Sequence, residues 1–64
     1  MGSPKQIGKD IKEAREKAEL TQVQVAEKIG VHFNYFAKIE RGEVSASQKT
    51  LRAIGKLLKI SISL

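Results

Sequence analysis

The hydrophobic and polar positions of the chain follow the period of an α-helix in four stretches. Residues three or four positions apart share one side of a helix, so apolar residues at that spacing predict a buried face. In the first stretch these positions are Ile7, Ile11, Ala14 and Ala18, and charged residues cover the other face. The helices predicted in this way span residues 6–18, 22–29, 33–41 and 48–58.

Residues that favour helix ends stand at the edges of these stretches. Thr21 is an N-cap for the second helix, and Gln24 three residues later completes a capping box. Ser47 caps the fourth helix in the same way. Gly30 and Gly42 follow the second and third helices, where a left-handed residue often ends a helix. Two short helices joined by a turn near a glycine predict a helix-turn-helix unit.

The spacing of apolar residues changes at the end of the chain. From Ile60 to Leu64 apolar and polar residues alternate, which predicts an extended tail. Ile60 is expected to close the end of the core, whereas Ile62 and Leu64 either pair with a second copy or lie against the fourth helix. Residues 1–5 are expected to be frayed. The pattern predicts a single all-α domain over residues 1–64, with 60–64 as a candidate dimerisation segment.

Composition narrows the function classes. Twelve Lys and Arg against seven Asp and Glu give 64 residues a net charge of +5, which fits a nucleic-acid partner or plain solubility equally well. The chain has no cysteine and one histidine, so no metal site is expected. Without a signal peptide or membrane span, a cytoplasmic location is expected. No nucleophile–base pair or phosphate-binding glycine loop is visible, so we expect no enzyme, cofactor or small-molecule substrate.

All three aromatic residues crowd into the start of the third predicted helix. Phe33, Tyr35 and Phe36 lie within four positions. Because each residue turns a helix by about 100°, Phe36 points inward with Ile39 and Glu40. Tyr35 lies on a flank and is expected to be half-buried. Phe33 lies at the leading tip of the helix.

The side of this helix opposite Phe36 carries polar groups suited to DNA. Asn34, Lys38 and Arg41 lie about 140° to 200° from Phe36, and the small Ala37 lies beside them. Asparagine pairs with adenine, lysine and arginine reach guanine or phosphate, and an apolar group contacts the thymine methyl. The same residues also suit a helix face that is simply solvated.

The run "LTQVQVAEKIGVHFNYFAKIERG" resembles the helix-turn-helix of the lambda-repressor-like family, which includes phage repressors, Cro proteins and bacterial xenobiotic-response-element-type relatives. The resemblance covers about residues 6 to 61. It implies a four- to five-helix bundle, although this chain stops too early for a full fifth helix. The matching positions are Leu20-Thr21-Gln22, Val25-Ala26, Gly30-Val31-His32, Phe36, Ile39-Glu40 and Gly42.

The resemblance implies a transcriptional regulator, either a repressor or a small controller protein, that binds double-stranded DNA as a homodimer. Its third helix would enter the major groove. Arg15 and Glu40 would form a buried structural salt bridge. The residues implied to face bases are Phe33, Asn34, Ala37 and Lys38. Those implied to contact the DNA backbone are Gln22, His32, Tyr35, Arg41, Ser45 and Ser47.

Several residues depart from the family pattern. His32 replaces a serine or threonine cap and is expected to cap poorly, so it either donates to a phosphate or is a plain turn residue. Phe33 replaces a hydrogen-bonding reader, which favours thymine-methyl contact or packing. Glu19 replaces a glycine that ends the first helix. Glu43 places a negative charge near the phosphate path. Gly55, inside the fourth helix, either allows close contact or weakens the domain.

A second function remains open at this point. Helix-turn-helix folds of this kind also serve as protein-interaction modules, such as antitoxins and bridging factors. Phe33, Ile62 and Leu64 would then be apolar anchors for a protein partner.

Overall fold

The computed structural model describes residues 3–62 and contains, within them, four α-helices and no strand. The predicted all-α class is therefore confirmed, and the predicted bounds of the last three helices agree with the structure. The helices are α1 (Pro4–Lys17), α2 (Gln22–Ile29), α3 (Phe33–Arg41) and α4 (Gln48–Leu58).

The first helix differs from the prediction at both ends. It begins at Pro4, and the Ser3 hydroxyl accepts a hydrogen bond from the Gln6 N–H at 3.2 Å. Residues 3–5 are thus ordered by an N-cap and a proline that favours a first helical turn, so the expected fraying is wrong there. Ala18 is the exposed C-cap of α1 and lies outside the apolar face to which it was assigned.

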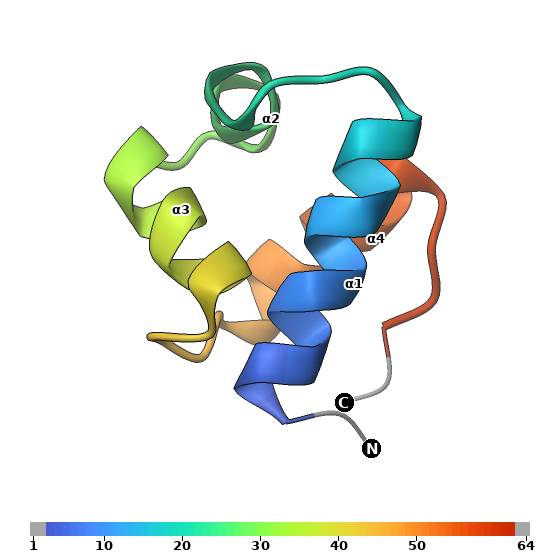
Figure 1. The fold of residues 1–64 in the computed structure, drawn as a ribbon. Helices are drawn as coiled ribbons and strands as arrows, with labels where there is room; N and C mark the ends of the chain where they lie inside the picture. The colour runs from blue at the N-terminus through green and yellow to red at the C-terminus, as the bar shows by residue number, and fades with distance from the viewer. Residues whose placement is uncertain (1–2, 63–64) are drawn as a thin grey trace.

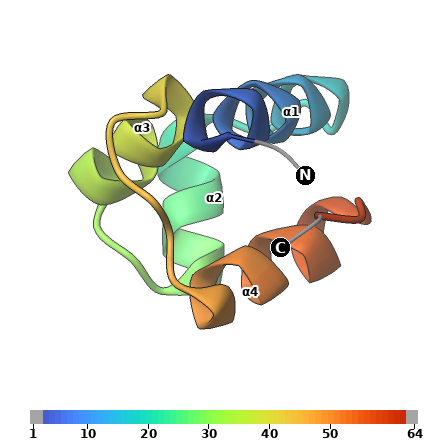
Figure 2. The same ribbon diagram turned by 90° about the horizontal axis from the view of Figure 1, so that it is seen from below.

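The helices enclose one core between them. α1 packs against α3 and α4, and α2 packs against the same two helices. In Figure 2, α1 and α4 lie on opposite sides of the molecule, with α2 between them. The first turn of α3 projects at the edge of the molecule in both Figure 1 and Figure 2. The side chains that are completely or almost completely buried come from all four helices: Ile11, Val25, Phe36, Ile39 and Ile54.

The tail packs against this core. Ile60 and Ile62 are partly buried against it, so Ile62 takes the intramolecular place that the sequence left open. Gly55 allows the close approach, because a Cβ atom there would lie 3.0 Å from the Ile60 carbonyl oxygen. Leu64 lies outside the described residues.

Two non-glycine residues adopt the left-handed backbone conformation. Glu19, with φ of 59°, follows the C-cap of α1 at the position where the family pattern has glycine, as the sequence indicated. Lys59, with φ of 57°, ends α4, and this site was not predicted. A side chain in this conformation costs about 1 kcal/mol, so the bundle is strained at two helix ends.

Two further features are absent from the described part of the chain. None of its helices is long and apolar enough to cross a membrane. Across residues 3–62, no group of three His, Cys, Asp or Glu side chains is arranged to hold a metal ion.

Candidate nucleic-acid interface

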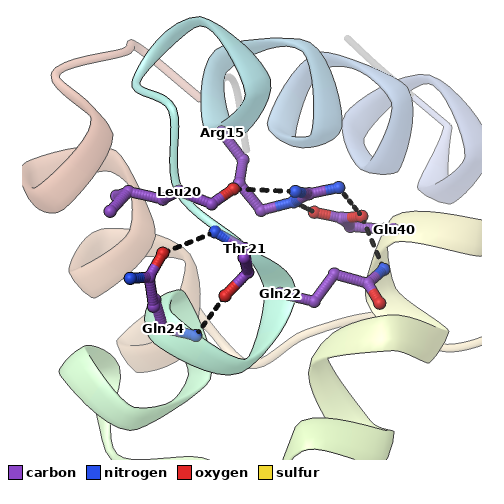
Figure 3. A network of polar contacts seen from close by, with 6 residues as sticks. All are labelled: Arg15, Leu20, Thr21, Gln22, Gln24 and Glu40. Carbon is purple, nitrogen blue, oxygen red and sulfur yellow. Dashed lines mark hydrogen bonds and ion pairs between the residues drawn. The ribbon is translucent and has the colours of Figure 1, made fainter.

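The start of α2 is fixed by the predicted capping box. The Thr21 hydroxyl accepts a hydrogen bond from the Gln24 N–H at 3.1 Å, and the Thr21 N–H donates to the Gln24 side-chain oxygen at 2.8 Å (Figure 3). Gly30, with φ of 75°, ends the helix in the left-handed conformation. These contacts set the length of α2 and the direction in which the chain enters the turn before α3.

His32 caps α3, contrary to the expectation that it would cap poorly. Its Nδ1 accepts a hydrogen bond from the Asn34 N–H at 3.0 Å. The expectation rested on the preference for serine, threonine, asparagine and aspartate at N-caps, but a neutral imidazole also offers one acceptor nitrogen. This bond places the ring proton on Nε2. The exposed His32 side chain therefore keeps a donor beside the tip of α3.

The two sides of α3 differ as the helical angles predicted. Phe36 and Ile39 are buried, whereas Asn34, Lys38 and Arg41 are exposed on the opposite side. The polar stripe is therefore accessible in the free protein and is not covered by another part of the described chain.

The remaining aromatic residues lie where the sequence placed them. Phe33 is 40% exposed at the tip of α3, and Tyr35 is half-buried on the flank. Packing within the domain covers only part of this phenyl ring and leaves the rest in contact with solvent. Phe33 is thus available for contact with another molecule.

Ala37 does not lie on the accessible face. Its exposed fraction is only 5%, so its side chain cannot contact a base edge in this conformation, and the predicted base-facing role is wrong for this residue. The reason is geometric, since Ala37 lies about 100° from Phe36, on a flank of α3 that the rest of the domain covers.

The predicted salt bridge between Arg15 and Glu40 is present. Arg15 Nε donates to Glu40 Oε2 at 2.6 Å, and Arg15 Nη2 donates to Glu40 Oε1 at 3.2 Å. The guanidinium also donates from Nη1 to the Leu20 carbonyl oxygen at 2.9 Å (Figure 3). The hydrogen bond to Glu40 is the main cause that raises the pKa of Arg15. This buried pair ties α1 to α3.

Gln22 joins the same network, which the sequence did not predict. Its Nε2 donates to Glu40 Oε1 at 2.8 Å, so Glu40 orients the carboxamide (Figure 3). An amide nitrogen has two hydrogens, and this bond uses one of them. Gln22 and Glu40 are 18 positions apart, so no local spacing rule connects them. The bond to Glu40 thus leaves the second amide hydrogen of Gln22 unused.

Arg41 is paired with Glu43 just beyond the end of α3. Arg41 Nε donates to Glu43 Oε2 at 2.6 Å, and Arg41 Nη2 donates to Glu43 Oε1 at 3.3 Å. The side chains are 54% and 51% exposed. The hydrogen bond from Arg41, with a smaller contribution from Lys38, lowers the pKa of Glu43. The sequence placed Glu43 near the phosphate path but did not reveal this pairing.

The segment between α3 and α4 runs along the outside of the molecule in Figure 2. Ser45 is exposed within it. Ser47 caps α4, because its hydroxyl oxygen accepts from the Thr50 N–H at 3.2 Å, and the hydroxyl also donates to Thr50 Oγ1 at 3.0 Å. Ser47 therefore has a structural role besides the backbone contact suggested for it, whereas the Ser45 hydroxyl is the more available of the two.

Comparison with known proteins agrees with this geometry. A family described as "Helix-turn-helix" matches residues 11–64. The chain is also 42% identical over 57 residues to the "Immunity repressor protein" of Bacillus phage phi105, and the alignment covers 89% of this chain and 40% of that protein. The chain thus spans less than half the length of this curated relative.

Proposed function

Since this chain belongs to the lambda-repressor-like helix-turn-helix family, we propose that it is a transcriptional repressor that binds double-stranded DNA in a sequence-specific manner. The observation that carries the proposal is the outer face of α3, where Asn34, Lys38 and Arg41 are exposed while the opposite side of the same helix is buried. A short helix held in this way fits the major groove, which is wide enough to admit it.

The tip of α3 supplies the base contacts in this proposal. Asn34 accepts from and donates to adenine, because its carboxamide matches the donor and acceptor on the major-groove edge of that base. Phe33 contacts a thymine methyl, which suits an exposed phenyl ring better than a hydrogen-bonding role. Lys38, one turn further along, reaches guanine or a phosphate.

The backbone contacts come from the groups around α3. Gln22 offers its second amide hydrogen at the start of α2, where the helix dipole also favours an anion. His32 offers its Nε2 proton, and Ser45 offers a hydroxyl from the segment that follows α3. Such contacts position a protein on the duplex without reading its sequence.

Repression requires occupancy of a site that polymerase must use. A homodimer that reads two half-sites about 34 Å apart would provide specificity and would require an operator with two-fold symmetry. The repressor assignment draws on the name of the phage relative, and the chain spans 40% of that protein. Repression and dimerisation are therefore parts of the proposal.

Selection from a random pool of duplexes tests the proposed function. We expect enrichment of one sequence with two-fold symmetry, and binding to that sequence that weakens steeply as salt rises. A pool that stays random after repeated rounds, together with binding that ignores salt, would refute the proposal.

The exposure of Phe33 favours one second candidate, a protein-interaction module. A phenyl ring that is 40% exposed is a suitable anchor for an apolar pocket on a protein partner. Capture of one stoichiometric protein by the wild type but not by Phe33→Ser, with no DNA retained, would support this candidate over the first.

A further inference from the structure

The pairing of Arg41 with Glu43 is held in place by the backbone. Gly42 ends α3 with φ of 74°, and this left-handed residue turns the chain back on the helix. The Gly42 N–H donates to the Ile39 carbonyl oxygen at 3.1 Å, and the Glu43 N–H donates to the Lys38 carbonyl oxygen at 2.9 Å. This helix-ending motif fixes the backbone of Glu43. The carboxylate therefore lies beside the last turn of α3.

This position brings a negative charge to the basic end of the polar stripe. The carboxylate takes two N–H groups of the Arg41 guanidinium, and Lys38 is close enough to contribute to its lowered pKa. A glutamate carboxylate is ionised at neutral pH, and the lowered pKa of Glu43 favours this form further. It therefore cancels much of the charge that Arg41 brings to the surface.

We infer that Glu43 weakens DNA binding by competing with a DNA phosphate for the Arg41 guanidinium. This inference rests on the proposed function and names a residue that sets the affinity of the same surface. Carboxylate and phosphate oxygens bind the guanidinium fork in the same two-pronged manner, so Arg41 serves one of them fully at a time. Glu43 also repels the phosphate directly, since both are anions.

The exposure of the pair makes the exchange feasible. Both side chains are about half exposed, and ion pairs in that environment are weak because water and salt screen them. A phosphate that arrives with the duplex can therefore replace the carboxylate without unfolding any part of α3. The phosphate must displace Glu43 from Arg41. In the complex, the displaced Glu43 carboxylate still lies near the phosphate and repels it.

The test compares Glu43→Gln with the wild type on a short random-sequence duplex across a salt series. We expect Glu43→Gln to bind about fivefold more tightly near 0.1 M salt. We also expect the slope of log affinity against log salt to steepen, because loss of the carboxylate raises by one the positive charge that the surface brings to the duplex. Thermal unfolding followed by circular dichroism confirms that the variant remains folded.

The matched control is Glu13→Gln, which makes the same charge change on the exposed side of α1. We expect it to alter affinity less than twofold, because its charge lies outside the surface built from α3. Equal gains for Glu13→Gln and Glu43→Gln would reduce the effect to net charge and overturn the inference.

The remaining outcomes are also decisive. Unchanged binding by Glu43→Gln would mean that Arg41 does not use the phosphate, and weaker binding would mean that Glu43 orients Arg41 productively; either overturns the inference and leaves the proposed function standing. A wild type that binds no duplex at any salt concentration overturns both.

Discussion

Arg15 in α1 and Glu40 in α3 form a buried ion pair, with Arg15 Nε 2.6 Å from Glu40 Oε2 and side chains that are 11% and 2% exposed. The same carboxylate accepts a hydrogen bond from Gln22 in α2. One buried acceptor thus joins the three helices that form the proposed DNA-binding surface. The orientation of α3 depends on this network as well as on its apolar side.

Removal of Arg15 should therefore destabilise the domain strongly. We expect Arg15→Met to lower the free energy of unfolding by about 3 kcal/mol or more, since the Glu40 carboxylate would be left buried without its partner. Urea unfolding followed by circular dichroism measures this change. Lys12→Met, on the exposed side of α1, is the control and should leave stability nearly unchanged. A loss below about 1 kcal/mol for Arg15→Met would show that Glu40 is adequately solvated without it.

Lys38→Ala should weaken DNA binding without unfolding the protein, because Lys38 is exposed. If Lys38 contacts a phosphate, affinity should fall for every sequence and the salt slope should decrease by about 1. If it contacts a base, the loss should be confined to one position of the selected site. Fluorescence anisotropy with duplexes substituted one base pair at a time distinguishes these results. Equal affinity of Lys38→Ala and wild type for all duplexes would remove Lys38 from the interface.

Glu19→Gly should stabilise the domain by about 0.5–1 kcal/mol, because glycine adopts the left-handed conformation without the steric cost. Glu13→Gly is the matched control, since the same substitution inside α1 should destabilise by about 1 kcal/mol. Thermal unfolding of both variants measures the difference in sign. A lower unfolding temperature for Glu19→Gly would mean that the glutamate side chain makes a favourable contact that outweighs the strain.

Glu43 should titrate below its ordinary value of 4.5 in the folded protein, because Arg41 donates hydrogen bonds to its ionised form. A lowered pKa means that the pair contributes stability above the ordinary value and that this contribution is lost as pH falls through the folded value. NMR titration of the Glu43 side chain measures the midpoint. Arg41→Gln should move that midpoint upward, and a midpoint that Arg41→Gln leaves in place would contradict the pairing in solution.

Local signals account for most of the fold. The capping box at Thr21 and the glycines at positions 30 and 42 fix helix ends through contacts within a few residues, so α2 and α3 were predicted with their observed bounds. The same logic failed at Ser3, because a lone serine before a proline was treated as part of a frayed end. The cap at His32 was missed for a similar reason, since residue preference was ranked above the acceptor that its imidazole provides.

The site itself was only partly predictable. Helical angles identified the exposed stripe that contains Asn34 and Lys38, but an angle does not tell how far a neighbouring helix covers a flank, so Ala37 was misplaced. The bond from Gln22 to Glu40 and the pairing of Arg41 with Glu43 depend on tertiary placement and on a backbone turn. Such contacts follow from the fold and leave no spacing signal in the sequence.

Titration of isotope-labelled protein with the selected duplex, followed residue by residue in amide NMR spectra, tests the central claim most directly. If the outer face of α3 lies in the major groove, the largest shifts should fall on Asn34, Lys38 and Arg41, with further shifts at Gln22, while α4 beyond its first turn stays nearly unchanged. Shifts confined to α4, or an unperturbed α3 at saturating duplex, would contradict the claim that α3 reads DNA.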